Sequence, residues 1–189
     1  LRGQVAMRME ARFRFDYGSI IPWVRRTEHG ITAFAGANAV HMTAPFELRG
    51  EGWSTVADFT LVEGQSVPMA LTWFSSFKRP PDPFDPQAQL DQTVRWWRGW
   101  CEKCTYTGKW REPVLRSAIT LKALTHSDTG GSVAAATTSL PESLGGVRNW
   151  DYRFCWLRDA TFTLYALMMS GFIEEAEAWR KWLVRAVAA

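Results

Sequence analysis

The segment "KRPPDPFDPQ", residues 78–87, divides the chain into two parts with different hydrophobic patterns. It contains four prolines, and each proline ring fixes φ and removes a backbone hydrogen-bond donor. Before this segment apolar residues alternate with polar ones, and after it they recur at helical spacing. We therefore expect a stiff connector at a domain boundary, with a β-sheet domain on its N-terminal side and a helical domain on its C-terminal side.

The N-terminal part is typical of antiparallel β-structure. Its first segment, "VAMRMEARFRFDY" at residues 5–17, alternates along its whole length, which predicts a long half-buried strand. Gly-bearing turns separate five further candidate strands, at 20–25, 31–35, 38–43, 54–62 and 67–74. Strands at this spacing, without helical patterns between them, predict an antiparallel β-sandwich. Because Leu1 enters the first strand almost at once, we expect the chain to be part of a longer protein.

The C-terminal part has four segments of helical periodicity, at 87–104, 111–125, 160–170 and 172–188. Pro113 lies in the first turn of the second segment, where a missing N–H costs least. Gly171 is expected as the C′ residue after the third. The fourth segment carries an apolar stripe on one side, made of Phe172, Ala176, Trp179, Leu183 and Ala186.

The cysteines predict a reducing compartment and no metal. There are three, Cys101, Cys104 and Cys155, and an odd number fits the cytoplasm better than a disulfide framework. Cys101 and Cys104 form a C-x-x-C pair, which could be a metal half-site or a redox pair. However, no second Cys/His pair follows, and the two thiols continue a helical stripe of Leu90, Val94 and Trp97. We therefore predict core thiols.

Composition and charge exclude several classes of protein. A chain of 189 residues with 47% hydrophobic content can bury a substantial core. The net charge of +3 is scattered, without a Lys/Arg run, so we expect no nucleic-acid partner. No apolar run reaches the roughly 18–20 residues that span a bilayer, so we expect a soluble protein. Eleven tryptophans suit both cores and sugar-stacking surfaces.

The stretch "RNWDYRFCWLRDATFTLYAL", residues 148–167, gathers the candidate functional residues. It closes a long loop, about 126–155, whose length and composition favour function over disorder. We expect Asp159 to be the N-cap of the next helix and to stay ionised. Arg158 and Asp159 together could hold two adjacent sugar hydroxyls, since the carboxylate accepts hydrogen bonds and the guanidinium donates them.

Three aromatic residues precede this pair, Trp150, Tyr152 and Trp156. Their rings could pack against the C–H groups of a pyranose. The alternative is that Asp159 only caps the helix, Arg158 is its ion-pair partner and the indoles belong to the core.

The segment from 110 to 187, with "TGGSVAAATTSLPE" and "RNWDYRFCWLRDAT", closely resembles the start of the catalytic domain of bacterial glycoside hydrolase family 15. That family includes glucoamylases, glucodextranases and trehalase-like enzymes. Residues 1–76 resemble, more loosely, the later part of the family's N-terminal β-sandwich domain.

The resemblance implies a β-sandwich at 1–77, a linker and linker helix at 78–109, and the first helices of an (α/α)6 barrel at 110–189. It implies inverting hydrolysis of an α-glucosidic bond by two glutamates about 6.5–9.5 Å apart, without a cofactor or metal. It places Trp156, Arg158 and Asp159 in the innermost glucose subsite. Trp150 and Tyr152 fall in the expected pocket rim, loop 137–152.

This chain departs from the family pattern in its length. It offers three helices after the linker helix, whereas the barrel needs about twelve, and the family's two catalytic glutamates correspond to positions beyond Ala189. Glu142, Glu174 and Glu175 match neither, and we expect them in the rim loop or on a helix exterior. We therefore assign no catalytic residue here.

We expect a fragment of an α-glucoside hydrolase, with homo-oligomers formed through exposed barrel helices. The alternative is a carbohydrate-binding or structural fragment without catalysis.

Overall fold

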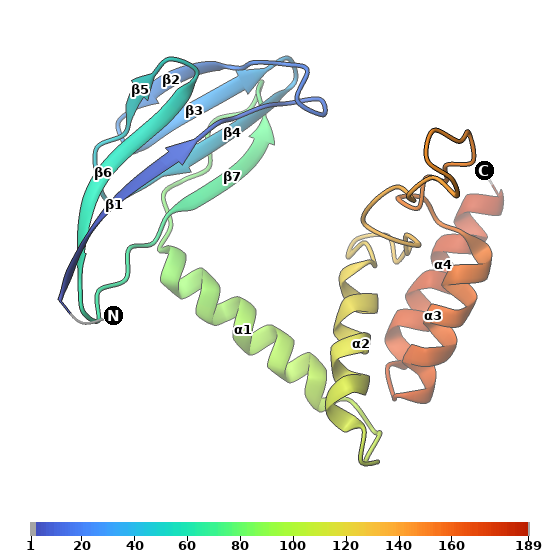
Figure 1. The fold of residues 1–189 in the computed structure, drawn as a ribbon. Helices are drawn as coiled ribbons and strands as arrows, with labels where there is room; N and C mark the ends of the chain where they lie inside the picture. Colours follow the sequence, from blue (N-terminus) through green and yellow to red (C-terminus); the bar gives the residue numbers. More distant parts are fainter. Residues whose placement is uncertain (1–2, 189) are drawn as a thin grey trace. The chain divides into compact units, whose positions relative to one another are not determined.

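The computed structural model describes residues 3–188 of the chain. These residues form two compact units, one running to Thr93 and the other starting at Val94. Antiparallel sheets make up the first unit, and helices dominate the second (Figure 1). The sequence prediction of a β-rich part followed by a helical part is therefore confirmed.

Seven strands lie in the described part of the first unit: β1 (Gln4–Ala11), β2 (Trp23–Thr27), β3 (Gly30–Ala35), β4 (Asn38–Thr43), β5 (Arg49–Glu51), β6 (Ser54–Val62) and β7 (Ala70–Ser75). They form one sheet in the order β1-β6-β5 and another in the order β2-β3-β4-β7, and every pairing is antiparallel. Six of the strands match predicted segments. The short strand β5 was not predicted.

The first strand is shorter than predicted. It ends at Ala11 rather than Tyr17, because the chain then turns back and the Phe15 N–H donates to the Ile20 carbonyl oxygen at 3.0 Å. Asp16 and Tyr17 both have positive φ, and the Ser19 hydroxyl donates to the Asp16 carboxylate at 3.0 Å. The alternation of apolar and polar residues therefore continues past the end of the strand into this turn.

The core of the first unit takes residues from both sheets. Ile31 and Met42, which face each other across β3 and β4, cluster with Ala57 of β6 and with Leu48. Beside them the rings of Phe46 and Phe59 stack with centroids 4.3 Å apart. Burial of these side chains supplies the main favourable free energy for this unit.

The four helices are α1 (Pro86–Glu102), α2 (Arg111–Ala123), α3 (Leu157–Met169) and α4 (Ile173–Ala188). Helix α1 begins where the connector ends: the Asp85 side chain accepts a hydrogen bond from the Gln87 N–H at 2.9 Å, and Pro86 takes the first helical position. Both are favoured at a helix start. None of the described helices is long and apolar enough to cross a membrane.

Helix α3 ends at Met169, and Gly171, with a φ of +96°, is the C′ residue as predicted. The Gly171 N–H donates to the Met168 carbonyl at 3.0 Å, and the Phe172 N–H donates to the Leu167 carbonyl at 2.9 Å. This is a Schellman motif, and both Phe172 and Leu167 are buried, as the motif favours. It fixes the turn between α3 and α4.

The core of the second unit is formed by residues of α1, α2 and α3 and of the segments that follow α1 and α3. Trp100 stacks on Phe172 with ring centroids 3.9 Å apart, and Cys104, Ala118 and Leu167 complete the buried cluster. The apolar stripe predicted for 172–188 is confirmed from Phe172 to Leu183, whose members are buried or half-buried. Its last member, Ala186, is exposed.

Both C-x-x-C thiols pack in or against this core, as predicted. Burial raises the pKa of the Cys101 thiol, which makes it a poorer nucleophile and metal ligand. The stripe that leads to them is only partly buried, because Leu90 and Val94 are exposed. Helix α1 also ends at Glu102, before Cys104.

Candidate functional site

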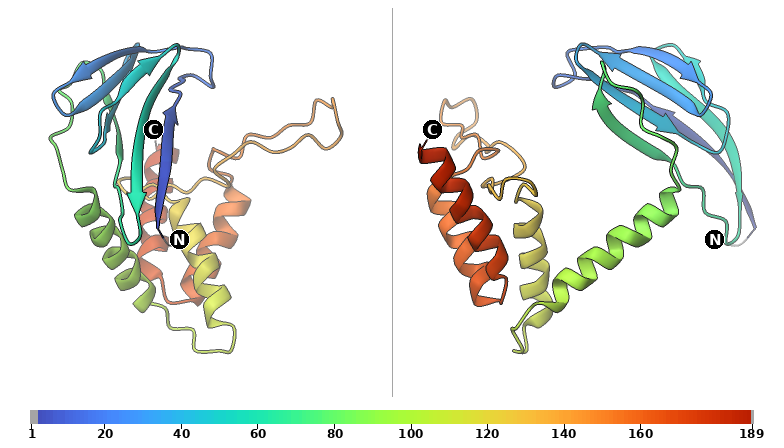
Figure 2. Two further views of the ribbon diagram at one scale, coloured as in Figure 1. Left: turned by 60° about the vertical axis from the view of Figure 1, so that its left-hand side comes forward. Right: turned by 180° about the vertical axis from the view of Figure 1, so that it is seen from behind.

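The loop between α2 and α3 is an ordered hairpin-like excursion. The Ala135 N–H donates to the Tyr152 carbonyl and the Ser139 N–H to the Trp150 carbonyl, both at 2.8 Å. The two arms of the loop therefore lie side by side and extend away from the helices (Figure 2). This arrangement holds the backbone of Trp150 and Tyr152, the two aromatic residues for which the family resemblance implies a position on the pocket rim.

Two glycines fix the start of this loop against α4. A Cβ atom on Gly130, which has a φ of +81°, would lie 2.6 Å from the Ala178 backbone. A Cβ atom on Gly131 would lie 2.9 Å from the Trp182 ring. Arg185 also donates to the Thr129 carbonyl at 2.8 Å. The "TGG" sequence therefore allows a close approach of loop and helix that larger residues would prevent.

The structure brings the three predicted aromatic residues together. The Trp156 ring packs edge-on against Trp150 and Tyr152, with centroid distances of 6.4 and 5.7 Å. The Trp156 indole N–H donates to the Asp151 carbonyl at 2.9 Å, which fixes its orientation. Trp150 remains 42% exposed and the other two are half-buried. A partly exposed aromatic cluster of this kind presents apolar surface to a ligand.

Asp159 is not the N-cap of α3, contrary to the prediction. The helix begins at Leu157, so the cap is Trp156, which makes no side-chain capping bond. Asp159 lies in the first turn, where the positive end of the helix still favours its carboxylate. Its contact with Arg158 is loose, with Nη2 3.4 Å from Oδ2, and the two side chains are 69% and 34% exposed. Donors and acceptors of both side chains thus remain for other hydroxyls.

Asp151, which lies beside this cluster, is held in an ion pair. Arg153 donates to its carboxylate through Nε at 3.0 Å and through Nη2 at 2.7 Å, and the Arg153 backbone N–H also donates at 3.0 Å. These bonds lower the pKa of Asp151. The carboxylate is consequently a poor proton donor near neutral pH.

Glu175 is buried, contrary to the prediction of a helix exterior. Only 5% of it is exposed, and its Oε1 accepts hydrogen bonds from Trp100 Nε1 at 2.7 Å and Lys122 Nζ at 3.0 Å. Burial acts to raise the pKa of Glu175, but the Trp100 and Lys122 hydrogen bonds outweigh it and hold the pKa below its ordinary value. Both bonds join α4 to other helices, which indicates a structural role.

The other two glutamates are exposed, as predicted. Glu142 pairs with Arg148 at 3.2 Å across the tip of the loop, and Glu174 pairs with Lys103 at 2.8 Å. The local sequence around Glu175 gives no signal of its burial, because its partners Trp100 and Lys122 lie on other helices. Within residues 3–188, no three His, Cys, Asp or Glu side chains are grouped so that they could hold a metal ion.

Comparison with known proteins finds a family match that lies within the second unit. Residues 108–189 match the sequence profile of glycosyl hydrolases family 15, and this span contains the whole aromatic cluster, Arg158 and Asp159. This segment belongs to that family.

Several trehalases resemble this chain over most of its length. The trehalase of Thermoplasma acidophilum is 35% identical over 163 residues, which are 86% of this chain and 28% of that protein. The trehalase of Mycobacterium tuberculosis is 37% identical over 185 residues, or 93% of this chain and 27% of that protein. The trehalase of Mycolicibacterium smegmatis is 40% identical over 139 residues, which are 73% of this chain and 21% of that protein.

The chain therefore spans about a quarter of the length of these curated relatives. No solved structure gives a significant match to it.

Proposed function

We propose that this chain is part of an inverting, trehalase-like glycoside hydrolase that acts on α-glucosidic bonds, and that it supplies part of the glucose-binding subsite. The observation that carries the proposal is the position of the Trp150, Tyr152 and Trp156 cluster next to Arg158 and Asp159, all within the family 15 match. The trehalase relatives point to trehalose as the first substrate to test.

The residues suit the recognition of a sugar rather than bond cleavage. The aromatic rings can pack against C–H groups of a pyranose. Asp159 can accept hydrogen bonds from two hydroxyls while Arg158 donates to a neighbouring oxygen. Inversion also needs an acid and a base about 6.5–9.5 Å apart. Asp151 is engaged with Arg153, and Glu175 with Trp100 and Lys122, so we assign neither role to this chain.

The proposed architecture is a β-sandwich over residues 1–77, a linker region over 78–109 and the first helices of an (α/α)6 barrel from 110. Core residues contributed by both sheets, and the contacts of α3 with both α2 and α4, support this view. The three free cysteines support a cytoplasmic location.

Homo-oligomers are a further part of the proposal. Large apolar side chains on α3 and α4 are more than half exposed, namely Phe162, Tyr165, Met169 and Val184. Exposed apolar surface of this kind favours association. Light scattering on the 189-residue chain is expected to give a mass above the monomer, and a monomer at high concentration would contradict this part.

The function is tested with the whole gene product. It is given trehalose and maltose, and freshly released glucose is followed by ¹H NMR, which separates the anomers. We expect β-glucose from the non-reducing residue of maltose or from one half of trehalose, the outcome of inversion. Binding of either sugar without glucose release would favour a carbohydrate-binding fragment instead. The 189-residue chain alone is expected to release no glucose, because it lacks an assigned acid and base.

A further inference from the structure

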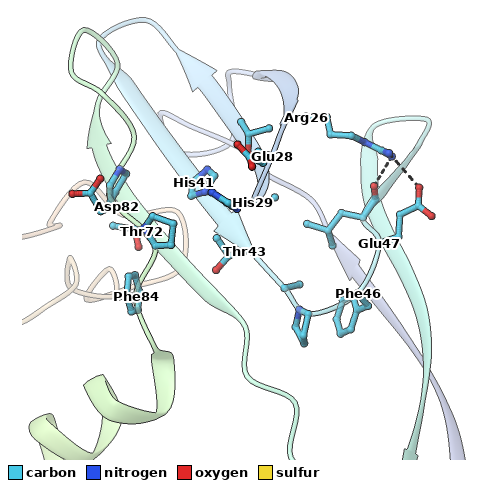
Figure 3. Close-up of a pocket in the computed structure, with 17 residues that line it drawn as sticks. Arg26, Glu28, His29, His41, Thr43, Phe46, Glu47, Thr72, Asp82 and Phe84 are labelled. Atoms are coloured by element: carbon cyan, nitrogen blue, oxygen red, sulfur yellow. Dashed lines mark hydrogen bonds and ion pairs between the residues drawn. The ribbon is translucent and has the colours of Figure 1, made fainter.

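A cavity of 590 Å³ lies in the first unit, between the four-stranded sheet and the Pro-rich connector (Figure 3). The β2–β3 turn contributes Glu28, β4 contributes His41, β7 contributes Thr72 and the connector contributes Asp82 and Phe84. Its volume falls within the roughly 300–1,000 Å³ of small-molecule sites. None of the residues assigned above to sugar recognition lines it.

The walls of this cavity are held by contacts that need no ligand. Arg26 donates to Glu47 at 3.2 Å and to the Leu48 carbonyl at 2.7 Å, so the segment after β4 is tied to β2. Phe46, in the same segment, is fixed by its stack on Phe59. The cavity is therefore preformed, which lowers the entropic cost of binding.

The turn between β2 and β3 also has a defined position. Gly30 has a φ of +146°, and a Cβ atom there would lie 2.0 Å from the Met42 carbonyl oxygen. Only glycine allows this approach of the turn to β4. The turn residues Glu28 and His29 are thereby held at the cavity, where Figure 3 shows His29 close to His41.

His41 forms a polar part of the cavity lining. It is only 8% exposed, and its Nδ1 lies 2.8 Å from Thr32 Oγ1, with which it shares a hydrogen bond across β3 and β4. Burial, and then the neighbouring His29, lower the pKa of His41. The imidazole is therefore neutral near pH 7, and a neutral imidazole has one donor and one acceptor nitrogen.

Two carboxylates in the lining are unused. Glu28 and Asp82 are both exposed, and in the described part of the chain neither forms an ion pair or hydrogen bond. Because Arg26 is already paired with Glu47, the lining has an excess of negative charge. This charge disfavours an anionic ligand and favours one that donates hydrogen bonds.

The remaining polar groups distinguish a polyol from a cation. The hydroxyls of Thr43 and Thr72 can donate as well as accept hydrogen bonds, and His41 keeps one ring nitrogen besides the one bonded to Thr32. An ammonium ion would match only the acceptors, whereas sugar hydroxyls match both kinds of group. The Phe84 ring, 43% exposed, offers an apolar face for C–H groups.

We propose that this cavity binds a neutral polyhydroxylated ligand of mono- or disaccharide size. Glu28 and Asp82 accept hydrogen bonds from its hydroxyls, and Phe84 packs against its C–H face. The inference is independent of the proposed function, because every residue in it precedes the segment that matches family 15.

The three histidines of the chain report on the proposal directly, because His29 and His41 line the cavity and His126 lies in the second unit. Their imidazole C–H resonances are assigned with His29→Gln and His126→Gln variants. They are then followed in the 189-residue chain while glucose, maltose or trehalose is added to roughly 100 mM, which fills a site of millimolar Kd. We expect saturable shifts at both His29 and His41 with at least one sugar.

Paired variants assign the binding to the carboxylates. Glu28→Gln and Asp82→Asn are each expected to weaken binding about tenfold, since each removes a charge-assisted hydrogen bond. Glu63→Gln, an exposed change outside the cavity, is expected to leave it unaltered. Tetramethylammonium is added in a separate titration as a cationic probe. The proposal would be overturned if no sugar shifted the resonances, if only tetramethylammonium did so, or if both cavity variants bound sugar as tightly as the unmodified chain.

Discussion

Trp100 of α1 donates its indole N–H to Glu175 of α4 at 2.7 Å, although the two residues are 75 positions apart in the chain. Lys122 of α2 donates to the same carboxylate oxygen at 3.0 Å. One buried carboxylate thus joins three helices of the second unit. A buried charge is costly unless it is paired and hydrogen-bonded, and here both conditions are met.

Removing this carboxylate should destabilise the second unit. Glu175→Ala leaves Trp100 Nε1 and Lys122 Nζ without their acceptor, so we expect the free energy of unfolding to fall by about 2–3 kcal/mol. Glu174→Ala is the matched control, because its ion pair with Lys103 is exposed and should contribute less than about 1 kcal/mol. Urea unfolding of both variants measures the difference. Equal losses would show that the buried network has no special role.

The burial of Glu175 was not predicted because of its residue type. Helical periodicity identified part of the buried faces of α1 and α4, because apolar residues recur every three or four positions. A carboxylate on the same face is taken as exposed by that reasoning, since acids are almost never fully buried unless paired. Its partners lie in other helices, so the sequence around Glu175 does not contain the signal.

Short elements and helix starts were the other limits of prediction. Strand β5 is three exposed residues and has no alternation to detect. The start of α3 was placed three residues late, because Asp159 has the type of a cap while Trp156, which lacks a capping side chain, takes that position. The three aromatic residues of the cluster were singled out from the sequence, whereas the cavity of the first unit was not predicted, because it assembles from four separate segments.

The close approach of the loop to α4 can be tested with alanine. Gly130→Ala combines a positive φ with a Cβ atom 2.6 Å from the Ala178 backbone, so we expect the free energy of unfolding to fall by about 2–4 kcal/mol. Gly64→Ala has a comparable φ of +79° but open space around it, and should cost about 1 kcal/mol. Thermal unfolding compares the two. If Gly64→Ala costs as much as Gly130→Ala, close packing against α4 is not what requires glycine.

The buried imidazole of His41 should make the first unit sensitive to acid. Its folded-state pKa is lowered by burial and by His29, so the unfolded state binds the proton more readily. Its contribution to stability is therefore complete above about pH 6.5, the unfolded value, and is lost as pH falls through the lowered folded pKa. An NMR titration should place the His41 midpoint below about 6.5. A midpoint at or above that value would contradict the assignment.

The cysteine pair should be dispensable for chemistry. Cys101→Ala and Cys104→Ala are expected to leave metal content and enzymatic turnover of the whole protein unchanged, because the thiols pack in or against an apolar core. Some stability should be lost at Cys104, which is the more buried of the two. Elemental analysis of the purified protein provides the check. Stoichiometric zinc that disappears in either variant would reverse the interpretation.

The central claim is that Asp159 binds sugar rather than merely stabilising the start of α3. Glu112 is a suitable control, because it is also an acidic residue in the first turn of a helix, α2, and lies outside the aromatic cluster. Asp159→Asn and Glu112→Gln should each cost less than about 1 kcal/mol of stability through the helix dipole.

The most direct measurement is kcat/KM for trehalose in the whole gene product carrying each of these two changes. We predict that Asp159→Asn lowers kcat/KM by at least about 100-fold while unfolding stays cooperative, because charge-assisted hydrogen bonds to the substrate are lost. Glu112→Gln should leave kcat/KM within about twofold of the unmodified protein. Equal, near-normal turnover in both variants would contradict the account and leave Asp159 as a helix-stabilising residue alone.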